Sequence, residues 1–258
     1  MKLTGGRRDD HMSATEQAPF VPFYGEKPGI AWAADVEADE FAPMMESIGD
    51  ADGLVVVKLG FEVALGLGLA EATKIVRSNS NAAVQYDHQK AANDIPDTSV
   101  NFVRTMVRGD VDSAILFPFT GPETQIAWTR ALQAEGIVVF TGAEMTHKRF
   151  KKSEGGSLPE TSLARIFDVA LDEGVDHFIV PGNKAASVAK WRKKIEQARG
   201  EGQFALGAPG FVNQGGDVTE AGRAAGRHLL PIIGRGIHES ANPREAVEFY
   251  AKQTREAA

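Results

Sequence analysis

Charged side chains of alternating sign gather where two apolar runs of the chain end. Asp87, Lys90 and Asp94 follow one such run, and Lys58 ends another. Such groups are unfavourable in an apolar core, because burying a charge is costly unless it is paired. They suit proton transfer next to an anion, since flanking carboxylates keep a lysine charged. We therefore expect Lys90, Asp87, Asp94 and Lys58 to be catalytic.

Two segments near the carboxyl end of the chain have the composition of a phosphate site. The first contains Gln214, Gly215 and Gly216, and the second contains Gly234 and Arg235. Glycines let backbone N–H groups approach a phosphate closely, and a guanidinium adds a forked cation. Alone, each segment would be equally consistent with a turn or a surface charge. Together they predict an enzyme that acts on a phosphorylated small molecule.

Composition narrows the class of protein. The chain has 258 residues, of which 43% are hydrophobic and 24% charged, which fits one large α/β domain or two small ones. No apolar run approaches the ~18–20 residues that cross a bilayer, so we expect a cytoplasmic protein without a membrane partner. The absence of cysteine excludes disulfides and sulfur-ligated metals. The net charge of −7 argues against nucleic acid as a partner.

The first 22 residues look foreign to the fold. They contain no apolar segment of the kind found in signal peptides. A vector-derived leader that ends at His11-Met12, or a flexible natural tail, explains them better. We therefore place a single catalytic domain at residues 23–258.

Short apolar runs alternate with amphipathic stretches along that domain. The predicted strands are Ile30–Ala34, Gly53–Leu59, Ala82–Tyr86, Ser113–Pro118, Ile137–Thr141, His177–Pro181, Gln203–Gly207 and His228–Ile233. The clearest helical spacings cover Ser162–Glu173, Ala186–Arg199 and Pro243–Arg255. Strands that are apolar throughout are typical of a parallel sheet, which is buried on both faces.

Eight such units in about 230 residues predict a (β/α)8 TIM barrel, with a doubly wound open sheet as the alternative. Polar residues favour the barrel. Asp35, Lys58, Asp87, Thr146 and Arg235 all fall at or just past the carboxyl ends of predicted strands. In a barrel these ends meet at one mouth, whereas an open sheet could not bring all of them to one ligand.

The connection over residues 146–157 is basic and then rich in glycine and serine. It follows the fifth predicted strand and therefore lies at the functional face. Two interpretations stay open. The connection is either an ordinary solvated loop or a lid attracted by a substrate phosphate.

The combination of motifs resembles the orotidine 5′-monophosphate decarboxylase family. The matching pieces span almost the whole predicted barrel, and only their combination is specific. They are Ala34-Asp35, Lys58-Leu59-Gly60, Asp87 with Lys90 and Asp94-Ile95-Pro96-Asp97-Thr98, Glu144-Met145-Thr146-His147, Pro209-Gly210, Gln214-Gly215-Gly216-Asp217 and Gly234-Arg235-Gly236-Ile237.

One departure from the family pattern concerns the charged array. The usual spacing is Asp-x-Lys-x-x-Asp, whereas this chain has three steps from Asp87 to Lys90 and four from Lys90 to Asp94. A bulge or short loop after the strand could still aim the three groups inward. His88 is the alternative occupant of the lysine's place.

The resemblance implies a role for each charged residue. Lys90 would protonate C6 of the pyrimidine as carbon dioxide leaves, and Asp87 would lie beside the scissile carboxylate. Asp35 and Lys58 would grip the ribose hydroxyls and complete the array. The intermediate is a carbanion without an electron sink, and neither a metal nor a cofactor is expected. Electrostatic preorganisation in a dry site would have to stabilise it.

The resemblance also implies the remaining contacts. Asp94 and Thr98 would enter the site of a partner subunit, so that the catalytic unit is a homodimer. Thr146 would contact the pyrimidine amide. The other expected contacts to orotidine 5′-monophosphate, or to the product uridine 5′-monophosphate, come from Ile95, Pro209, Gln214, Gly215, Gly216, Gly234 and Arg235.

Two other functions remain. A magnesium-dependent sugar-phosphate decarboxylase or hexulose-phosphate synthase of the same superfamily also uses an Asp/Lys/Asp cluster. A barrel that binds a phosphorylated ligand without catalysis is favoured only by the altered spacing.

Overall fold

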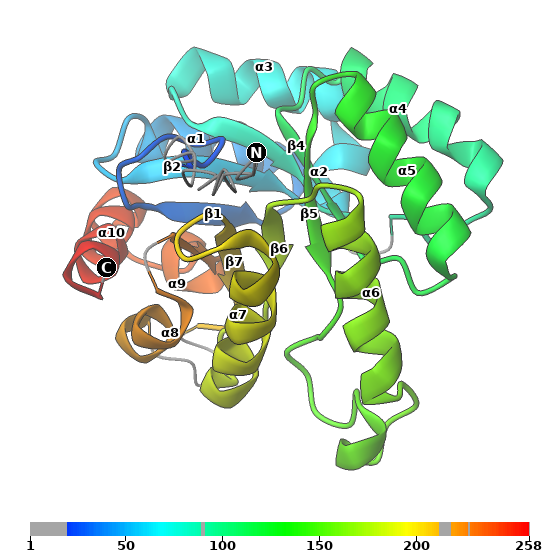
Figure 1. The fold of residues 1–258 in the computed structure, drawn as a ribbon. Helices are drawn as coiled ribbons and strands as arrows, with labels where there is room; N and C mark the ends of the chain where they lie inside the picture. The colour runs from blue at the N-terminus through cyan, green and yellow to red at the C-terminus, as the bar shows by residue number, and fades with distance from the viewer. Residues whose placement is uncertain (1–19, 89–90, 212–217, 227, 258) are drawn as a thin grey trace, which may run out of the picture.

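The computed structural model describes residues 20–88, 91–211, 218–226 and 228–257. They form a closed barrel of parallel strands in the order β1 to β8, with helices packed around it (Figure 1). β1 pairs with both β2 and β8, which closes the sheet. The predicted (β/α)8 barrel is confirmed, and the open doubly wound sheet is excluded.

The strands and helices alternate along the chain. The strands are β1 (Ile30–Ala34), β2 (Leu54–Leu59), β3 (Ala83–Tyr86), β4 (Ser113–Leu116), β5 (Val138–Gly142), β6 (His177–Ile179), β7 (Ala205–Pro209) and β8 (Leu229–Ile233). The helices are α1 (Ala38–Ile48), α2 (Phe61–Gly66), α3 (Leu69–Asn79), α4 (Ser99–Arg108), α5 (Pro122–Ala134), α6 (Glu160–Asp172), α7 (Ala185–Arg199), α8 (Val218–Ala225), α9 (Arg235–His238) and α10 (Pro243–Ala257). Two 3₁₀ turns, η1 (Pro96–Thr98) and η2 (Lys152–Glu154), complete the set.

Both faces of the strands are buried, as the continuous apolar runs predicted. Val56, Ile115 and Phe140 belong to a cluster inside the barrel, whereas Trp32 and Val57 belong to the larger cluster between strands and helices. Successive strand residues point to opposite faces. Lys58 therefore points to the same side as Val56, which is the inside of the barrel.

The predicted helix ends lie within two residues of the observed ones for α6, α7 and α10. Among the strands, β7 differs most from its predicted position. It begins at Ala205 rather than at Gln203 and ends at Pro209 rather than at Gly207. Gly202 has a positive φ of 68°, so the turn after α7 continues up to the strand. The shift makes Pro209 the last residue of β7. No helix among the described residues is both long and apolar enough to cross a membrane.

Aromatic residues before β1 cover the amino-terminal end of the barrel. The Phe23 N–H donates to Nε2 of His177 at 3.4 Å, and the Phe23 ring contacts that of Phe140. Phe20, which we assigned to the leader, packs against the rings of His177 and His228. Among the described residues, Phe20 therefore already contacts the barrel.

Candidate active site

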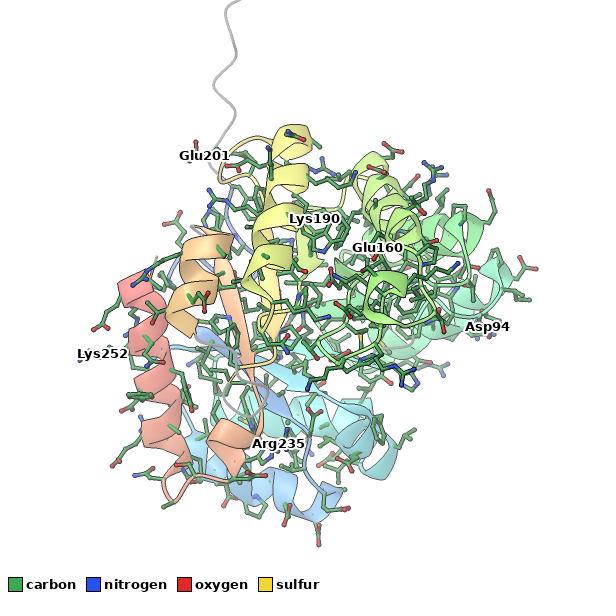
Figure 2. All side chains as sticks on the ribbon, turned by 90° about the horizontal axis from the view of Figure 1, so that it is seen from below. Asp94, Glu160, Lys190, Glu201, Arg235 and Lys252 are labelled. Carbon is green, nitrogen blue, oxygen red and sulfur yellow. The ribbon has the colours of Figure 1, made fainter. Side chains whose placement is uncertain are left out.

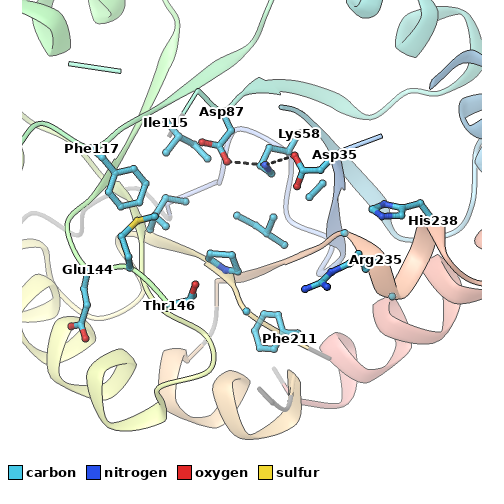
Figure 3. A pocket seen from close by; sticks show the side chains of 18 of the residues that line it. Asp35, Lys58, Asp87, Ile115, Phe117, Glu144, Thr146, Phe211, Arg235 and His238 are labelled. Atoms are coloured by element: carbon cyan, nitrogen blue, oxygen red, sulfur yellow. Dashed lines mark hydrogen bonds and ion pairs between the residues drawn. The ribbon is translucent and has the colours of Figure 1, made fainter. Parts of the chain in front are cut away.

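A cavity of about 470 Å³ opens at the carboxyl ends of the strands. Every strand, or the residues that follow it, contributes to its lining (Figure 3). The predicted site residues in the lining are Asp35, Lys58, Asp87, Thr146, Pro209, Gly234 and Arg235. The barrel thus brings together residues from six separate parts of the sequence, as expected for residues at or just past strand ends.

Lys58 and its two carboxylates form the charged centre of this pocket. The Lys58 Nζ lies 2.8 Å from Oδ2 of Asp87 and 3.5 Å from Oδ1 of Asp35. Only 4% of the Lys58 side chain and 6% of the Asp87 side chain are exposed. Burial by itself lowers the pKa of the Lys58 ammonium, but the charges of Asp87 and Asp35 outweigh it and raise the pKa above its ordinary value. Lys58 is therefore a fixed cation at neutral pH.

Strand register places these groups side by side. Ala33, which lies two residues before Asp35, pairs with Lys58 of β2, and Lys58 pairs with Gln85 of β3. Asp87 lies two residues past Gln85 and points to the same side of the sheet. Gly60 leaves the room that the Asp35 carboxylate occupies, because a Cβ at that position would overlap Asp35 Oδ1.

Two residues of the predicted catalytic array remain, Lys90 and Asp94. Lys90 lies outside the described residues. Asp94 is exposed at the outer edge of the molecule (Figure 2), where its Oδ1 accepts a hydrogen bond from the Ile95 N–H at 2.7 Å. Thr98 donates its hydroxyl to the Ile95 carbonyl at 2.8 Å. Within one chain, Asp94, Ile95 and Thr98 do not line the pocket that contains Asp87.

The segment after Lys90 is held by the loop between β4 and α5. Phe117 N–H donates to the Ala91 carbonyl at 3.2 Å, and the Asn93 side chain donates to the Phe117 carbonyl at 2.8 Å. Asn93 Oδ1 accepts from the Phe119 N–H at 2.9 Å, and the Thr120 hydroxyl donates to the Ala92 carbonyl at 2.9 Å. The stretched spacing is thus accommodated by a segment with its own hydrogen bonds.

His88, the alternative occupant of the site, lies elsewhere. Its side chain is exposed, and its Nδ1 lies 2.5 Å from the Tyr86 hydroxyl. Together with Leu65 and Asp94 it lines a separate groove of about 460 Å³ beside α2 and α4. The structure therefore does not place His88 in the pocket of Lys58.

Arg235 lies on another side of the pocket from the Lys58–Asp87 pair (Figure 3). It follows β8 directly, at the start of α9, and none of the ion pairs among the described residues includes it. The guanidinium is thus available to an anion. Three other residues of the predicted phosphate site, Gln214, Gly215 and Gly216, lie outside the described residues.

Several lining residues had no predicted role. Ile115 and Phe117 form an apolar wall beside Asp87, and His238 lies next to Arg235 (Figure 3). His238 Nδ1 is buried and has no hydrogen-bond partner among the described residues. In the sequence, only the closely spaced aromatic residues Phe117 and Phe119 at the end of the fourth predicted strand could have pointed to this wall. Apolar residues at strand ends are usually core, so this signal did not single it out.

The connection over residues 146–157 is more than a solvated loop. Lys151 lies 2.6 Å from Glu144, which lies just before the connection, and Lys184 of the β6–α7 loop lies 3.0 Å from Glu154. Phe150 is buried and packs near His147 and Phe119. Ion pairs and ring contacts therefore fix the connection on both sides. Among the described residues, no three His, Asp or Glu side chains converge to hold a metal ion.

Known proteins with a similar fold provide independent comparisons. The structure of orotidine 5′-monophosphate decarboxylase from Methanocaldococcus jannaschii complexed with the inhibitor BMP superposes with a TM-score of 0.72 at 22% identity, and covers 88% of this chain and 99% of that one. The orotidine 5′-phosphate decarboxylase from Pyrococcus horikoshii has a TM-score of 0.69 at 24% identity, with the same coverage. These likenesses show the fold.

Sequence comparison reaches further. The orotidine 5′-phosphate decarboxylase of Methanosphaera stadtmanae is 28% identical over 198 residues, which are 76% of this chain and 83% of that protein. The model of the orotidine 5′-phosphate decarboxylase / HUMPS family matches residues 28–250, which include all eight strands and every residue that lines the pocket. A match of that extent makes this chain a member of the orotidine 5′-phosphate decarboxylase / HUMPS family.

Proposed function

We propose that the protein converts orotidine 5′-monophosphate to uridine 5′-monophosphate and carbon dioxide. The observation that carries the proposal is a buried lysine between two carboxylates, in the same pocket as the Arg235 guanidinium, which forms no ion pair with the residues that the structure describes. Such a pocket offers fixed charges for a reaction at one end and a cation for a phosphate at the other. Membership of the family and relatives named orotidine 5′-phosphate decarboxylase support this substrate.

The chemistry is a proton transfer coupled to loss of carbon dioxide. The bond between C6 and the carboxylate carbon breaks, and its electron pair stays on C6. We assign the proton donor to Lys90, which would deliver its proton to C6. Asp87 would lie beside the departing carboxylate and Lys58 would hold Asp87 in place. A preorganised ammonium in a pocket that excludes water stabilises a developing carbanion far better than water does.

The remaining contacts orient the substrate. Asp35 would bind the ribose hydroxyls, and Thr146 together with Pro209 would contact the pyrimidine. Arg235 and the Gly234 backbone would bind the phosphate, with Gln214, Gly215 and Gly216. The energy of phosphate binding would be used to hold the reacting base in position.

We further propose that the active unit is a homodimer, with Asp94, Ile95 and Thr98 reaching into the neighbouring site. Large exposed apolar side chains on α2, on α4 and at Ile95 itself support the proposal: Phe61 is 57% exposed, Leu65 76%, Ile95 59% and Val100 58%. Leu65 and Asp94 line the same groove. Exposed apolar surface of this kind marks a protein interface more often than free solvent surface.

An ultraviolet assay of orotidine 5′-monophosphate loss tests the proposal, with EDTA present and no cofactor added. Turnover to uridine 5′-monophosphate is the expected result. Turnover of a sugar phosphate only, and only with added magnesium, would assign the protein to the other branch of its family. Tight binding of a uridylate without any turnover would make it a ligand-binding barrel.

A further inference from the structure

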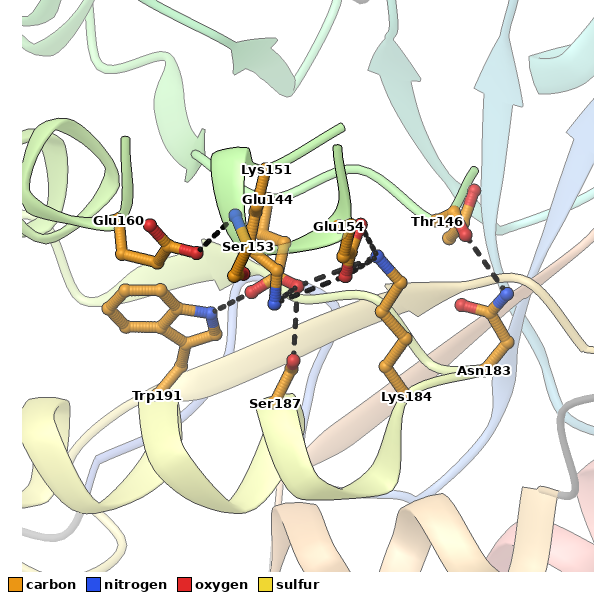
Figure 4. A network of polar contacts seen from close by, with 10 residues as sticks. All are labelled: Glu144, Thr146, Lys151, Ser153, Glu154, Glu160, Asn183, Lys184, Ser187 and Trp191. Atoms are coloured by element: carbon orange, nitrogen blue, oxygen red, sulfur yellow. Dashed lines mark hydrogen bonds and ion pairs between the residues drawn. The ribbon is translucent and has the colours of Figure 1, made fainter. Parts of the chain in front are cut away.

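Glu144 is a buried carboxylate at the end of β5 with donors from several segments (Figure 4). Its side chain is 1% exposed. Its Oε1 lies 2.6 Å from the Lys151 ammonium and accepts the Ser187 hydroxyl at 3.0 Å. Its Oε2 accepts the indole N–H of Trp191 at 2.8 Å. One side chain thus joins the end of β5 to the following loop and to helix α7.

Glu154 completes a ring of four charges. Its carboxylate lies 3.3 Å from Lys151 Nζ and 3.0 Å from Lys184 Nζ, and Lys184 also lies 3.6 Å from Glu144. Burial alone raises the pKa of Glu154, but the two ammonium groups outweigh it and lower that pKa. Burial lowers the pKa of Lys151, and Glu144 and Glu154 reverse this effect. Lys151 and Glu154 are therefore both charged at neutral pH.

The ring adjoins the place where three loops of the pocket meet. Thr146 follows Glu144 by two residues, and its carbonyl accepts the Asn183 side chain at 3.2 Å. Asn183 immediately precedes Lys184 of the ring. Gly210 closes the junction, because a Cβ there would lie 3.0 Å from Thr146 Cγ2 and 3.3 Å from Asn183 Cβ. A shift of the ring would therefore move Thr146 against its neighbours.

Glu144 lines the pocket, but its carboxylate points away from the pocket centre (Figure 3). Its oxygens are already engaged by Lys151, Ser187 and Trp191. Buried ion pairs add little to stability compared with apolar residues of the same volume, although removing one partner is costly. Their clear physical effect here is to fix the geometry of the loops that carry Thr146 and Asn183.

We propose that Glu144 is a positioning residue for the end of the pocket that takes the nucleobase. It locks the β5–α6 loop to α7 and thereby holds Thr146 at the base. This inference rests on the proposed function, because that function assigns the base to the neighbourhood of Thr146. It goes beyond that function by naming a residue that acts on the base without touching it.

The first test uses the unmodified protein and the indole N–H signal of Trp191 in ¹H–¹⁵N spectra. The chain has three tryptophans, so Trp191→Phe assigns the signal. We expect uridine 5′-monophosphate to shift this signal and ribose 5-phosphate, which lacks the base, to leave it in place. A Trp191 signal that neither ligand moves, or that both move equally, would overturn the proposal.

The second test compares Glu144→Gln with Glu196→Gln, which changes a carboxylate on the same helix as Trp191 but outside the ring. We expect Glu144→Gln to weaken uridine 5′-monophosphate binding, and to lower kcat/KM, by about 10- to 100-fold. Binding of ribose 5-phosphate should stay unchanged, and Glu196→Gln should match the wild type throughout.

The outcomes separate the two proposals. Equal losses for both ligands in Glu144→Gln would make Glu144 a merely structural residue, even if the wild type decarboxylates the nucleotide. If Glu144→Gln weakens binding of uridine 5′-monophosphate only, and the wild type does not turn over orotidine 5′-monophosphate, the positioning role is sustained and the proposed reaction is rejected. Binding of neither ligand by the wild type would reject both.

Discussion

Lys58 is a buried ammonium whose charge is set by the two residues beside it. The contact to Asp87 is the shorter of the two, at 2.8 Å, and Asp87 is buried as well. Because the pKa of Lys58 is raised, its contribution to stability is complete below the ordinary lysine pKa of about 10.4 and is lost only above it. Activity measured between neutral and mildly alkaline pH therefore will not report titration of Lys58.

Replacing Lys58 by methionine should damage both folding and catalysis. Breaking one side of a buried pair costs about 3–5 kcal/mol of unfolding free energy. Loss of a preorganised charge should lower kcat/KM by about 10²–10³-fold. Urea unfolding and the ultraviolet assay measure the two effects. The double variant Lys58→Met/Asp87→Asn should regain stability but not turnover, and near-native kcat/KM in either variant would remove Lys58 from the site.

Arg235→Ala should act on substrate binding rather than on the chemical step. The loss of a charge-assisted hydrogen bond to the phosphate should raise KM by about 10- to 100-fold. Turnover of orotidine, which has no phosphate, should not change. Lys252→Ala, an exposed cation on α10, is the control and should leave both substrates unaffected. Equal losses for orotidine and its phosphate would place Arg235 outside the phosphate site.

At the scale of elements, the segment over residues 91–95 shows how a loop takes up an altered spacing. It has no regular secondary structure, and its carbonyl groups accept hydrogen bonds from residues of the β4–α5 loop and of α5. The Asn93 side chain adds two further contacts, one as donor to Phe117 and one as acceptor from Phe119. The segment therefore places Asp94 through tertiary contacts rather than through its own propensity.

Asn93→Ala should lower stability by about 1–3 kcal/mol, because it removes two side-chain hydrogen bonds that join the segment to Phe117 and Phe119. It should also lower kcat/KM, since Asn93 lies between Lys90 and Ile95. Asn79→Ala is the matched control, because that half-buried side chain donates only to its own helix at Ile75. Urea unfolding and the ultraviolet assay are again the measurements. A stability loss in Asn93→Ala without any effect on kcat/KM would show that the segment does not position the site.

The sequence predicted the barrel because its strands are short apolar runs that end in polar residues. The same rule identified Lys58 and Asp87, which lie at strand ends and meet through register. It did not reveal the ring of Glu144 and Lys184, because these residues belong to different connections without a fixed spacing. Nor did it show that Ala91 and Asn93 bind the β4–α5 loop, since hydrogen bonds between distant segments leave no local pattern.

At the scale of the whole molecule, the proposed catalytic residues do not all lie in one pocket. Asp87 and Lys58 are buried inside the barrel mouth, whereas Asp94 is exposed at the outer edge beside apolar side chains. A second copy of the chain that covers this edge would bury those side chains. Two-fold symmetry would then give each pocket the Asp94 of the other chain.

This arrangement predicts complementation between two inactive variants. Lys90→Ala and Asp94→Ala homodimers should both be inactive. In their heterodimer, one of the two sites combines an intact Lys90 with an intact Asp94 from the other chain. A co-refolded equal mixture should therefore regain about a quarter of the wild-type activity, and the purified heterodimer about half. The assay is turnover of orotidine 5′-monophosphate by heterodimers purified with two different affinity tags.

The matched control is a mixture of Lys90→Ala and Lys58→Met. Both substitutions affect residues that act in their own chain's pocket, so every site of that heterodimer keeps one defect and activity should not rise above that of Lys58→Met alone. Recovery in the first mixture alone requires Asp94 to act in the neighbouring site. If purified Lys90→Ala/Asp94→Ala heterodimers remain inactive, Asp94 does not serve the neighbouring pocket, and the exposed edge has to be explained by contacts that leave catalysis to one chain.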